Sequence, residues 1–490
     1  MSVNKFHRII IALAVVIYCI TAYNSNGYIH EDEHYQIIEF ARLKSGVNQV
    51  QDLAWEYTIQ VRSAIQPLIA YTVFSICNKI SITDPYTLAF ILRLLSAMLA
   101  IYIITQFVRS TLSLIELRFQ RFYIFIAYLL WFLPFLNVRF SSEAWAGLFC
   151  MWAVATALKN KGQYCFIGSL LGLAFLFRFQ TIILSVSLLS WLLFIKKDQW
   201  KNIIKIAEGI TIVVLAGIAI DYWFYGEFTL TPYNYFYANI ILDIASKFGI
   251  SPWYDYIKAI VIRPSMFIGI PILFSLVILF IKDRKNLFLW LTIPFLIIHS
   301  IIPHKEFRFL FPIANFIPIL LLLAYQQINW TKHLNPKVAK LITNSILILL
   351  FIGNGIALFA VAIRAADGRV AISKYIHTKY SYQPISIVYS RWADYFTPRI
   401  PANFYKEENA TLIQLDSLST LQTQFIDTTQ INFYVLRRGL DTKLNKKYGD
   451  LLKNLGYIKE MQSIPVWIER LGIPCKMVYE NDILELYRKQ

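Results

Sequence analysis

An acidic segment flanked by histidines follows the first apolar run, at residues 30–34. It reads His-Glu-Asp-Glu-His, so three carboxylates, Asp32 and Glu33 among them, lie between two imidazoles. A carboxylate held at a membrane surface can act as a general base that takes a proton from a hydroxyl group. The alternative is a solvated loop whose acids favour a helix N-terminus. Because such acids are not needed for topology, we interpret the segment as a catalytic candidate.

The same five residues match H-E-x-x-H, the pattern of zinc metalloproteases. In such a protease, His30 and His34 would lie one helical turn apart and bind zinc, and the intervening glutamate would be the base. The chain shows no clear third-ligand motif, although Glu39 or Glu56 is available. A membrane zinc protease therefore stays open as an alternative.

A second polar segment interrupts two apolar runs. It contains His304, Lys305, Glu306 and Arg308. The Lys and Arg here are expected on the far, extracytoplasmic side of the membrane. The positive-inside preference disfavours cations on that side, so their presence there needs another explanation. A phosphate suits them, because Arg offers a bidentate fork and Lys a point charge. The alternative is that Glu306 simply pairs with Arg308.

Two further arginines, Arg139 and Arg178, each fall between two apolar runs. An unpaired Arg within a membrane is costly, so we expect both to line a polar cavity or to pair with acids such as Glu143. Acids beside the membrane and cations at bilayer depth predict a reaction on a lipid-linked phosphate. The acid would be the base, and the cations would hold the departing phosphate. No Walker A motif, Gly-rich nucleotide loop or serine triad is visible in the sequence.

The composition sets the class of protein that must position these residues. The 490 residues are 57% hydrophobic and 16% charged, with a mean hydropathy of +0.50. A soluble chain would be about a quarter charged, so these values exclude a soluble enzyme, a disordered protein and a coiled coil. They predict an α-helical polytopic membrane protein. The net charge of +17 fits Lys- and Arg-rich cytoplasmic loops, and we expect no nucleic-acid partner.

The cysteines give no sign of a site. The five cysteines show no paired spacing, so we expect neither a disulfide framework nor a cysteine-ligated metal.

Apolar runs of membrane-spanning length, roughly 20 residues each, recur about twelve times. They lie near residues 8–23, 64–79, 86–108, 122–138, 142–158, 164–177, 179–195, 205–223, 260–281, 286–302, 308–327 and 340–363. The first is expected to be a retained helix, because no small-residue cleavage site follows it. The C-terminal part, 364–490, instead alternates short β-like runs with charged turns.

Lysines in short loops place the N-terminus and loops 196–205 and 282–285 in the cytoplasm. Loops 23–62 and 224–258 and the C-terminal domain then fall on the far side. The arginines at 109, 118 and 121 disagree with the count of spans from the N-terminus. One segment before residue 122 is therefore expected to be split, re-entrant or not a span.

The sequence thus divides into a transmembrane catalytic domain over 1–363 and an extracytoplasmic soluble domain over 364–490. In the soluble domain we expect strands at Ile385–Tyr389, Ile431–Leu436 and Pro465–Ile468, and an amphipathic helix at Asp441–Leu455. These elements predict an α/β or α+β fold, which we expect to shape the acceptor entrance.

Four segments resemble the lipid-phosphate-mannose-dependent mannosyltransferases of GPI-anchor and N-glycan assembly, within the GT-C superfamily. They are His30-Glu31-Asp32-Glu33 with Gln36 and Glu39, Arg62-Ser63 with Pro67, Phe248-Gly249 with Pro252-Trp253-Tyr254, and His304-Lys305-Glu306 with Arg308-Phe309 and Pro312. They match the family's H-P-D-E…Q…E, I-R-S…P, F-G…P-W-Y and H-K-E-x-R-F…P motifs. Glu31 stands where the family has proline, and Arg178-Phe179-Gln180 stands where many relatives have R-P-T.

The resemblance implies a GT-C-like enzyme with an extracytoplasmic active site. Mannose would move with inversion from a polyprenyl-phosphate donor to a hydroxyl of a glycan or glycolipid, with no obligatory metal. Asp32 carries over as the base, with Glu33 as its neighbour. Donor-phosphate contact carries over to His304, Lys305 and Arg308, with Arg178 and Arg139 as further candidates. Substrate contact would fall to His30, Gln36, Arg62, Trp253, Tyr254 and Glu306.

Three alternatives remain besides this interpretation. They are a GT-C enzyme that moves another sugar or a phospho-group from a lipid carrier, the membrane zinc protease, and a transporter or flippase of lipid-linked sugar. The family spans endoplasmic reticulum and bacterial membranes. The composition rich in Ile, Lys and Asn, with short loops, favours a bacterial inner membrane.

Overall fold

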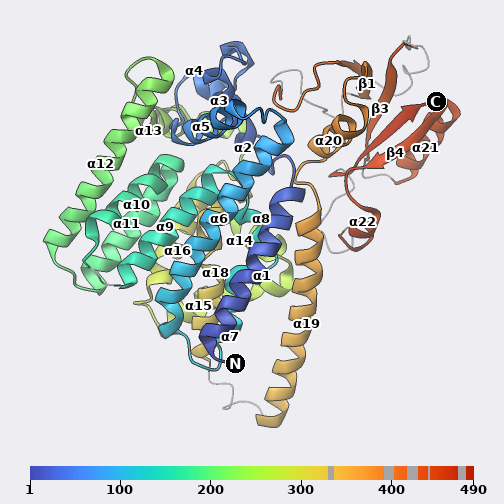
Figure 1. Ribbon diagram of the computed structural model, residues 1–490. Coiled ribbons are helices and arrows are strands. Elements are labelled where there is room, and N and C mark those ends of the chain that lie inside the picture. Colours follow the sequence, from blue (N-terminus) through green and yellow to red (C-terminus); the bar gives the residue numbers. More distant parts are fainter. Residues whose placement is uncertain (160–161, 329–335, 391–401, 416–428, 440–441, 473–481) are drawn as a thin grey trace. The chain divides into compact units, whose positions relative to one another are not determined.

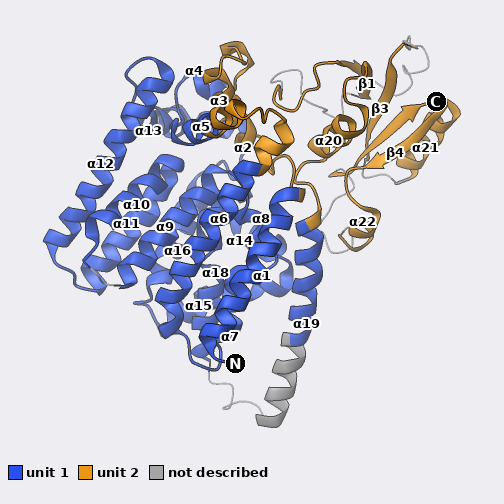
Figure 2. Ribbon diagram, viewed as in Figure 1, with its two compact units in different colours: residues 1–23, 55–72, 91–362 blue, residues 24–54, 73–90, 363–490 orange. Residues whose placement is uncertain are grey.

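The structure is a computed structural model that describes residues 1–490 except 160–161, 329–335, 391–401, 416–428, 440–441 and 473–481 (Figure 1). It divides into two compact units (Figure 2). Unit 1 comprises residues 1–23, 55–72 and 91–362, and unit 2 comprises residues 24–54, 73–90 and 363–490. In this division the acidic segment 30–34 groups with the C-terminal residues.

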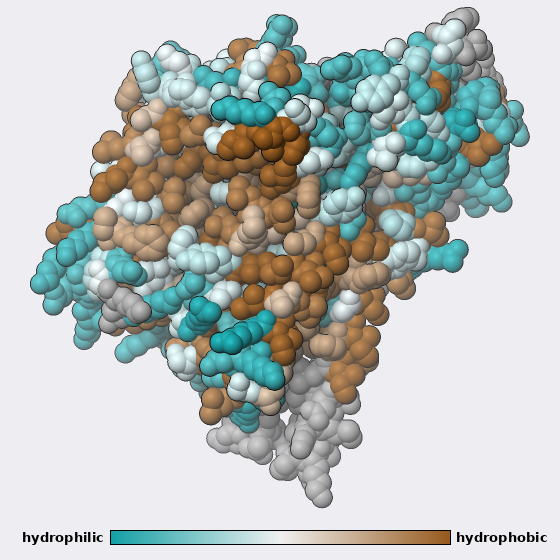
Figure 3. All heavy atoms as spheres, viewed as in Figure 1, coloured by the Kyte–Doolittle hydropathy of each residue, from teal (hydrophilic) through white to brown (hydrophobic). Residues whose placement is uncertain are grey.

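Unit 1 is helical. Its helices are α1 (Val3–Asn24), α4 (Trp55–Thr58), α5 (Ile65–Lys79), α6 (Pro85–Thr111), α7 (Gln120–Leu129), α8 (Phe132–Asn137), α9 (Ser142–Lys159), α10 (Tyr164–Phe177), α11 (Ile182–Ser190), α12 (Trp200–Tyr225), α13 (Thr231–Phe236), α14 (Asp255–Ile262), α15 (Met266–Lys282), α16 (Leu287–Ile301), α17 (Phe311–Ala314), α18 (Ile317–Gln326) and α19 (Pro336–Ile363). The ends of α1, α5, α6 and α19 extend into unit 2. Apolar side chains gather over these helices, as a membrane protein requires (Figure 3).

The helical membrane architecture is confirmed, but many of the expected runs form short or bent helices. Among the described residues, three helices are long and apolar enough to cross a membrane, or up to six if each bent pair is one span. The three are Val3–Asn24, Pro85–Leu114 and Trp200–Tyr225. The runs at 164–177 and 179–195 form shorter apolar helices. Hydropathy detects apolar character but not the bends that shorten a helix.

The structure explains the conflict before residue 122. The Arg93 side chain donates from Nε to the Ala22 carbonyl at 2.6 Å, near the end of α1. Towards the other end of the same two helices, the Tyr128 hydroxyl bonds both His7 of α1 and Thr105 of α6. Helices α1 and α6 are therefore antiparallel, and the chain between them leaves and returns at one end. Helix α5, which is the apolar run 64–79, is not among the described helices that are long and apolar enough to cross a membrane, and Arg121, in α7, bonds the Met1 carbonyl and so lies with the N-terminus.

Close helix contacts in unit 1 depend on glycines that let backbones touch. A Cβ at Gly168 of α10 would lie 2.0 Å from the Ile206 carbonyl oxygen of α12. A Cβ at Gly147 of α9 would lie 2.6 Å from the Cα of Pro312 in α17. Small residues at helix contacts are typical of membrane proteins. The second contact matters for the site, because it holds the start of α9 near the segment that carries Arg308.

Unit 2 contains a five-stranded mixed sheet of order β2-β1-β3-β5-β4. The strands are β1 (Ile385–Ser390), β2 (Ala410–Leu415), β3 (Ile431–Arg437), β4 (Tyr457–Gln462) and β5 (Leu484–Lys489). Strand β1 pairs in parallel with β2 and β3, and β5 pairs antiparallel with β3 and β4. The helices of the unit are α2 (Asp32–Tyr35), α3 (Ile38–Lys44), α20 (Gly368–Tyr380), α21 (Thr442–Asn454) and α22 (Val466–Gly472).

The expected strands at 385–389 and 431–436 and the expected helix at 441–455 are confirmed as β1, β3 and α21. The strand expected at Pro465–Ile468 is wrong, because this segment begins α22. The Pro465 carbonyl accepts hydrogen bonds from the amides of Ile468 and Glu469. Proline suits the start of a helix, where the N–H that it lacks would have no partner in the helix.

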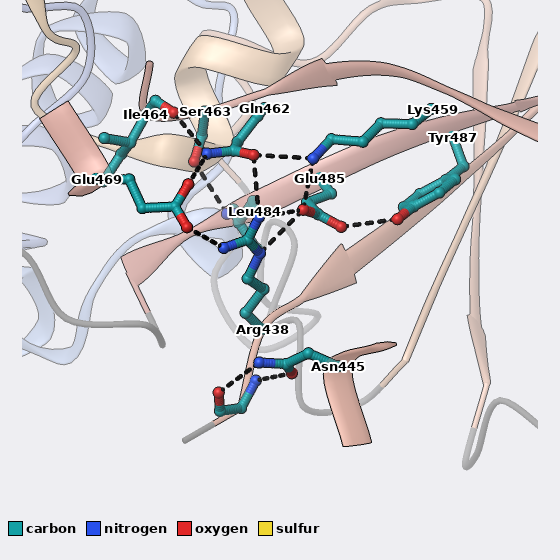
Figure 4. Close-up of polar contacts among 11 residues, drawn as sticks. Arg438, Asn445, Lys459, Gln462, Ser463, Ile464, Glu469, Leu484, Glu485 and Tyr487 are labelled. Atoms are coloured by element: carbon teal, nitrogen blue, oxygen red, sulfur yellow. Dashed lines mark hydrogen bonds and ion pairs between the residues drawn. The ribbon is translucent and has the colours of Figure 1, made fainter. Parts of the chain in front are cut away.

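A partly buried ion network links β3, β4, β5 and α22 (Figure 4). Arg438, just after β3, donates to Glu485 of β5 at 2.7 Å and to Glu469 of α22 at 2.5 Å. Lys459 of β4 donates to Glu485 at 2.6 Å, and the Tyr487 hydroxyl donates to the same carboxylate at 2.7 Å. Burial raises the pKa of Glu485, but these donors outweigh it and lower the pKa below its ordinary value. The network ties three strands and a helix together.

The described cysteines are Cys19, Cys77, Cys150 and Cys165, and all four are free thiols. Cys475 lies outside the described residues.

Candidate active site

Four charged residues from three separate segments of unit 1 meet in a buried cluster. Arg308 donates from Nη1 to Glu143 at 2.8 Å, and Arg178 lies 3.4 Å from the same carboxylate oxygen. Arg308 also bonds Glu306 through Nε. Both guanidinium groups lie over the Phe309 ring, at 4.9 Å for Arg178 and 5.2 Å for Arg308. We call Glu143, Arg178, Glu306 and Arg308 the arginine cluster.

The cluster is positioned by breaks in helices. Arg178 follows the end of α10 and has extended backbone angles, so its side chain does not continue the apolar face of that helix. Glu143 lies in the first turn of α9, where an acid is favoured by the helix dipole. Arg308 lies in the 3₁₀ turn Phe307–Leu310 that precedes α17. Arg178, Arg308 and Glu143 are all buried, so their mutual pairing offsets the cost of burial.

Two of the predicted phosphate ligands have other partners in the structure. His304 bonds the Gly249 carbonyl through Nδ1 at 2.8 Å and Glu306 through Nε2 at 2.9 Å. The Lys305 ammonium donates to the carbonyls of Ser251 at 3.0 Å and Ile302 at 2.6 Å. Burial lowers the pKa of Lys305. Both side chains therefore tie the 249–251 turn to the arginine cluster.

Arg62 belongs to the same polar region of unit 1. Its guanidinium lies 5.7 Å from the centre of the Tyr235 ring, and it is close enough to Arg178 for charge repulsion. Arg139 is buried, with its guanidinium 6.0 Å from the Phe135 ring centre. Arg62, Arg178 and Arg308 therefore share one region with the carboxylates of the cluster.

Asp221 lies at the end of an apolar run, and the sequence alone gave it no role; in the structure it holds the segment after Arg62 in place. One Asp221 oxygen accepts from the Ala64 amide at 2.6 Å and from the Ser63 hydroxyl at 3.2 Å. The other accepts from the Thr231 hydroxyl at 2.7 Å. A buried acid at the end of the span α12 was the available signal, but its partners lie far away in the sequence.

Asp221→Asn is expected to weaken transfer without removing a group that touches substrate. The amide nitrogen cannot accept hydrogen bonds, so the donors of the 63–64 segment or of Thr231 lose an acceptor, at a cost of about 1–3 kcal/mol. We expect a higher donor KM with a smaller change in kcat. Steady-state kinetics with varied donor measure this split. Asp243→Asn, a change at an exposed residue of the 224–258 loop, is the matched control. A wild-type donor KM in Asp221→Asn would contradict this positioning role.

In unit 2, the predicted base lies at the start of a short helix. Asp32 is the first residue of α2, and its side chain is 19% exposed. The His30 ring lies beside it, with Nδ1 accepting from the Asp32 amide at 3.3 Å and lying 3.5 Å from its carboxylate. Glu33 is buried and accepts from the Ile29 amide at 3.4 Å. The partly exposed Asp32 therefore suits a base better than Glu33 does.

The second histidine of the H-E-x-x-H pattern is part of the core of unit 2. His34 bonds Glu39 through Nε2 at 2.7 Å and stacks between the rings of Tyr28 and Tyr405. Glu39 also accepts from Asn48 at 2.6 Å and from the Phe404 amide at 3.1 Å. Burial raises the pKa of Glu39, but His34, Asn48 and Arg42 outweigh it and lower the pKa. The ionised Glu39 thus ties the first loop to residues 404–405.

The zinc-protease alternative requires both histidines to face one ion. The His34 Nε2 atom instead bonds Glu39, and the backbone from His30 to His34 is not one continuous helix. Within the part of the chain that the structure describes, no group of three or more His, Cys, Asp or Glu side chains could hold a metal. This arrangement does not favour that alternative.

An ion pair anchors the acidic loop to the residues after α19. Arg369 lies 3.6 Å from Glu31 and 2.8 Å from Asp367, and its guanidinium lies 5.3 Å from the Tyr28 ring centre. Although burial lowers the pKa of Arg369, Asp367 raises it above its ordinary value. Glu31, which stands where the related family has proline, is thereby held by charge.

The remaining predicted substrate contacts differ in exposure. Gln36 is buried in unit 2. In unit 1, Trp253 is 66% exposed and Tyr254 is 51% exposed, and the two rings meet edge to face. Their exposure on the 224–258 loop suits contact with the membrane interface as well as with a sugar.

Comparison with known proteins assigns the family. The chain matches the Alg9-like mannosyltransferase family over residues 9–399. It belongs to this family. The expectation drawn from the four motifs is thereby confirmed.

Individual relatives agree with the family. The chain is 24% identical to the GPI alpha-1,2-mannosyltransferase 3 of Bos taurus, over 66% of this chain and 59% of that protein. It is 28% identical to the GPI mannosyltransferase 3 of Candida albicans, over 60% of this chain and 58% of that protein. The chain thus matches less than two thirds of the length of these relatives. They are eukaryotic, so they do not support the bacterial inner membrane that the composition favoured.

The fold resembles that of a solved structure. The crystal structure of ArnT from Cupriavidus metallidurans bound to undecaprenyl phosphate matches with a TM-score of 0.55, 12% identity and coverage of 99% of this chain and 98% of that one. The same protein in the apo state matches with a TM-score of 0.51. The expected GT-C-like fold with a small C-terminal domain is confirmed.

Proposed function

We propose that the chain is an inverting mannosyltransferase that moves mannose from a polyprenyl-phosphate donor to a hydroxyl of a glycan or glycolipid. The acceptor hydroxyl attacks the anomeric carbon of the sugar, and the bond from that carbon to the phosphate oxygen breaks. Asp32 takes the proton from the hydroxyl, and the phosphate leaves on its lipid. The reaction would take place on the extracytoplasmic face, where the topology predicted from Lys and Arg places both loops.

The observation that carries the proposal is the arginine cluster of a chain that belongs to a mannosyltransferase family. Arg178 and Arg308 share one carboxylate of Glu143, and Arg62 lies close to Arg178. Arg62, Arg178 and Arg308 bring three guanidinium groups to this region against the two carboxylates of the cluster, Glu143 and Glu306, so the cluster region has an excess of positive charge. Such an excess suits an anionic ligand, and guanidinium forks suit a phosphate.

Stabilising the departing phosphate is the step for which this cluster is suited. Negative charge grows on the phosphate oxygens as the sugar leaves, and fixed cations in a water-poor site stabilise that charge strongly. His304 and Lys305 contribute indirectly, because they hold the adjacent turn through Gly249 and Ser251. This assignment narrows the expected phosphate contacts to Arg178 and Arg308.

The test is transfer by the detergent-purified protein in EDTA, from polyprenyl-phosphate-mannose to a panel of mannosyl glycans and glycolipids. We expect a mannosylated product whose anomeric configuration, read by NMR, is opposite to that of the donor. Transfer in EDTA also separates this proposal from a zinc protease. No transfer from any mannose donor, together with transfer from another lipid-linked sugar, would move the assignment to that sugar.

A further inference from the structure

Two glutamine side chains flank the arginine cluster, and each has a buried atom without a hydrogen-bond partner among the described residues. The atoms are Nε2 of Gln66 and Oε1 of Gln180. Gln66 is only 2% exposed. Buried polar atoms are nearly always hydrogen-bonded, so each unpaired one calls for a partner.

Gln66 is connected to the cluster through α9. Its Oε1 accepts a hydrogen bond from the Ser142 hydroxyl at 3.1 Å. Ser142 directly precedes Glu143, the carboxylate that Arg178 and Arg308 share. Gln66 itself lies in the first turn of α5, four residues after Arg62.

Gln180 approaches the same region from the 3₁₀ turn after Arg178. Its Nε2 bonds the Tyr235 hydroxyl. The Tyr235 ring in turn lies 5.7 Å from the Arg62 guanidinium. The contacts of Gln66 and Gln180 therefore lead to neighbouring members of one polar region, Arg62, Glu143 and Arg178.

We propose that Gln66 and Gln180 bind hydroxyl groups of the sugar whose phosphate lies against Arg178 and Arg308. A hydroxyl donates and accepts, so it satisfies either atom of an amide, whichever way the amide is turned. A phosphate oxygen cannot satisfy an amide oxygen, and a cation cannot satisfy an amide N–H. Neutral amides beside guanidinium groups therefore match a sugar joined to a phosphate. This inference rests on the proposed function and adds to it the residues that distinguish one sugar from another.

The experiment measures binding rather than transfer. Full-length wild type, Gln66→Leu and Gln180→Leu are titrated with polyprenyl phosphate and with the same lipid phosphate carrying mannose, glucose or N-acetylglucosamine. We expect wild type to bind one sugar-bearing lipid about 10-fold more tightly than the bare one. Each variant should lose that preference and keep its affinity for the bare lipid phosphate. Gln327→Leu, at the exposed residue that follows α18, should bind like wild type.

A second measurement needs no substitution in the protein. Donors that lack one sugar hydroxyl at a time are compared on wild type, and at least one deletion should weaken binding about 10-fold. The same deletion should have little further effect in the variant that has lost the matching amide. Unchanged affinity for all deoxy donors in wild type would overturn the inference. So would variants that lose affinity for bare and sugar-bearing lipids equally.

The two proposals fail in different ways. Sugar-dependent binding through the glutamines without mannosyl transfer would contradict the proposed function and leave the sugar site standing. Mannosyl transfer with an unchanged sugar preference in both variants would overturn the sugar site alone.

Discussion

Asp32→Asn should lower kcat by about 10²–10⁴-fold, the usual contribution of a general base. The amide has nearly the shape of the carboxylate but cannot take the proton of the acceptor hydroxyl. Asp32 is partly exposed and lies at the start of α2 beside His30, so the substitution opens no cavity. Donor binding should stay close to wild type, because the base does not hold the phosphate. Single-turnover transfer separates these two quantities.

The matched control for this change lies in the same loop. Asp52 has the same side chain as Asp32, and its carboxylate accepts a hydrogen bond from the Gln49 amide at 3.1 Å. Asp52→Asn should keep nearly the wild-type rate. A wild-type rate in Asp32→Asn would remove Asp32 as the base, and a large loss in Glu33→Gln alone would transfer the role to Glu33.

Arg308→Gln should lower kcat/KM by about 10²–10³-fold, as expected when one fixed donor to a developing negative charge is lost. The substitution also removes a partner of both Glu143 and Glu306. Those carboxylates would then repel the donor phosphate that Arg308 now attracts. The affinity for bare polyprenyl phosphate should therefore fall as well, which an equilibrium titration measures.

Two variants separate this effect from misfolding. Breaking a buried ion pair costs about 3–5 kcal/mol of stability, so the thermal unfolding of Arg308→Gln must be compared with wild type. Arg308→Lys keeps the charge without the fork and should recover part of the donor affinity. Arg263→Gln removes an exposed guanidinium above Phe307 and should change neither quantity. A folded Arg308→Gln protein with wild-type affinity for polyprenyl phosphate would exclude Arg308 from the phosphate site.

Some of the site was predictable because the residues that form it are close in sequence. The pairing of Glu306 with Arg308 spans two residues, so the spacing already allowed it. The expected pairing of Arg178 with Glu143 was also correct, because an unpaired guanidinium cannot stay in an apolar region. Local spacing and solvation cost were sufficient for these predictions.

Other features depend on contacts that no local pattern contains. Glu143 meets Arg308 across 165 residues because Gly147 lets α9 touch the backbone of Pro312. Asp221 meets Ala64 across 157 residues. His34, which sequence reasoning weighed as a zinc ligand, bonds Glu39, and Glu39 also holds the Phe404 amide from 365 residues away. Helix packing decides these partners.

The sequence by itself determined that the chain is a helical membrane protein, which segments carry its chemistry, and the family to which it belongs. Apolar content and short motifs can be recognised without the fold, because they depend only on residue types and on the spacing of neighbouring residues. The tertiary structure alone decided that α1 and α6 run antiparallel, since that depends on contacts between residues far apart in the sequence. It alone decided that Lys305 donates to backbone carbonyls while Arg178 and Arg308 share the Glu143 carboxylate. These charged side chains could each pair with several groups, and helix packing determines which of those groups lies within reach.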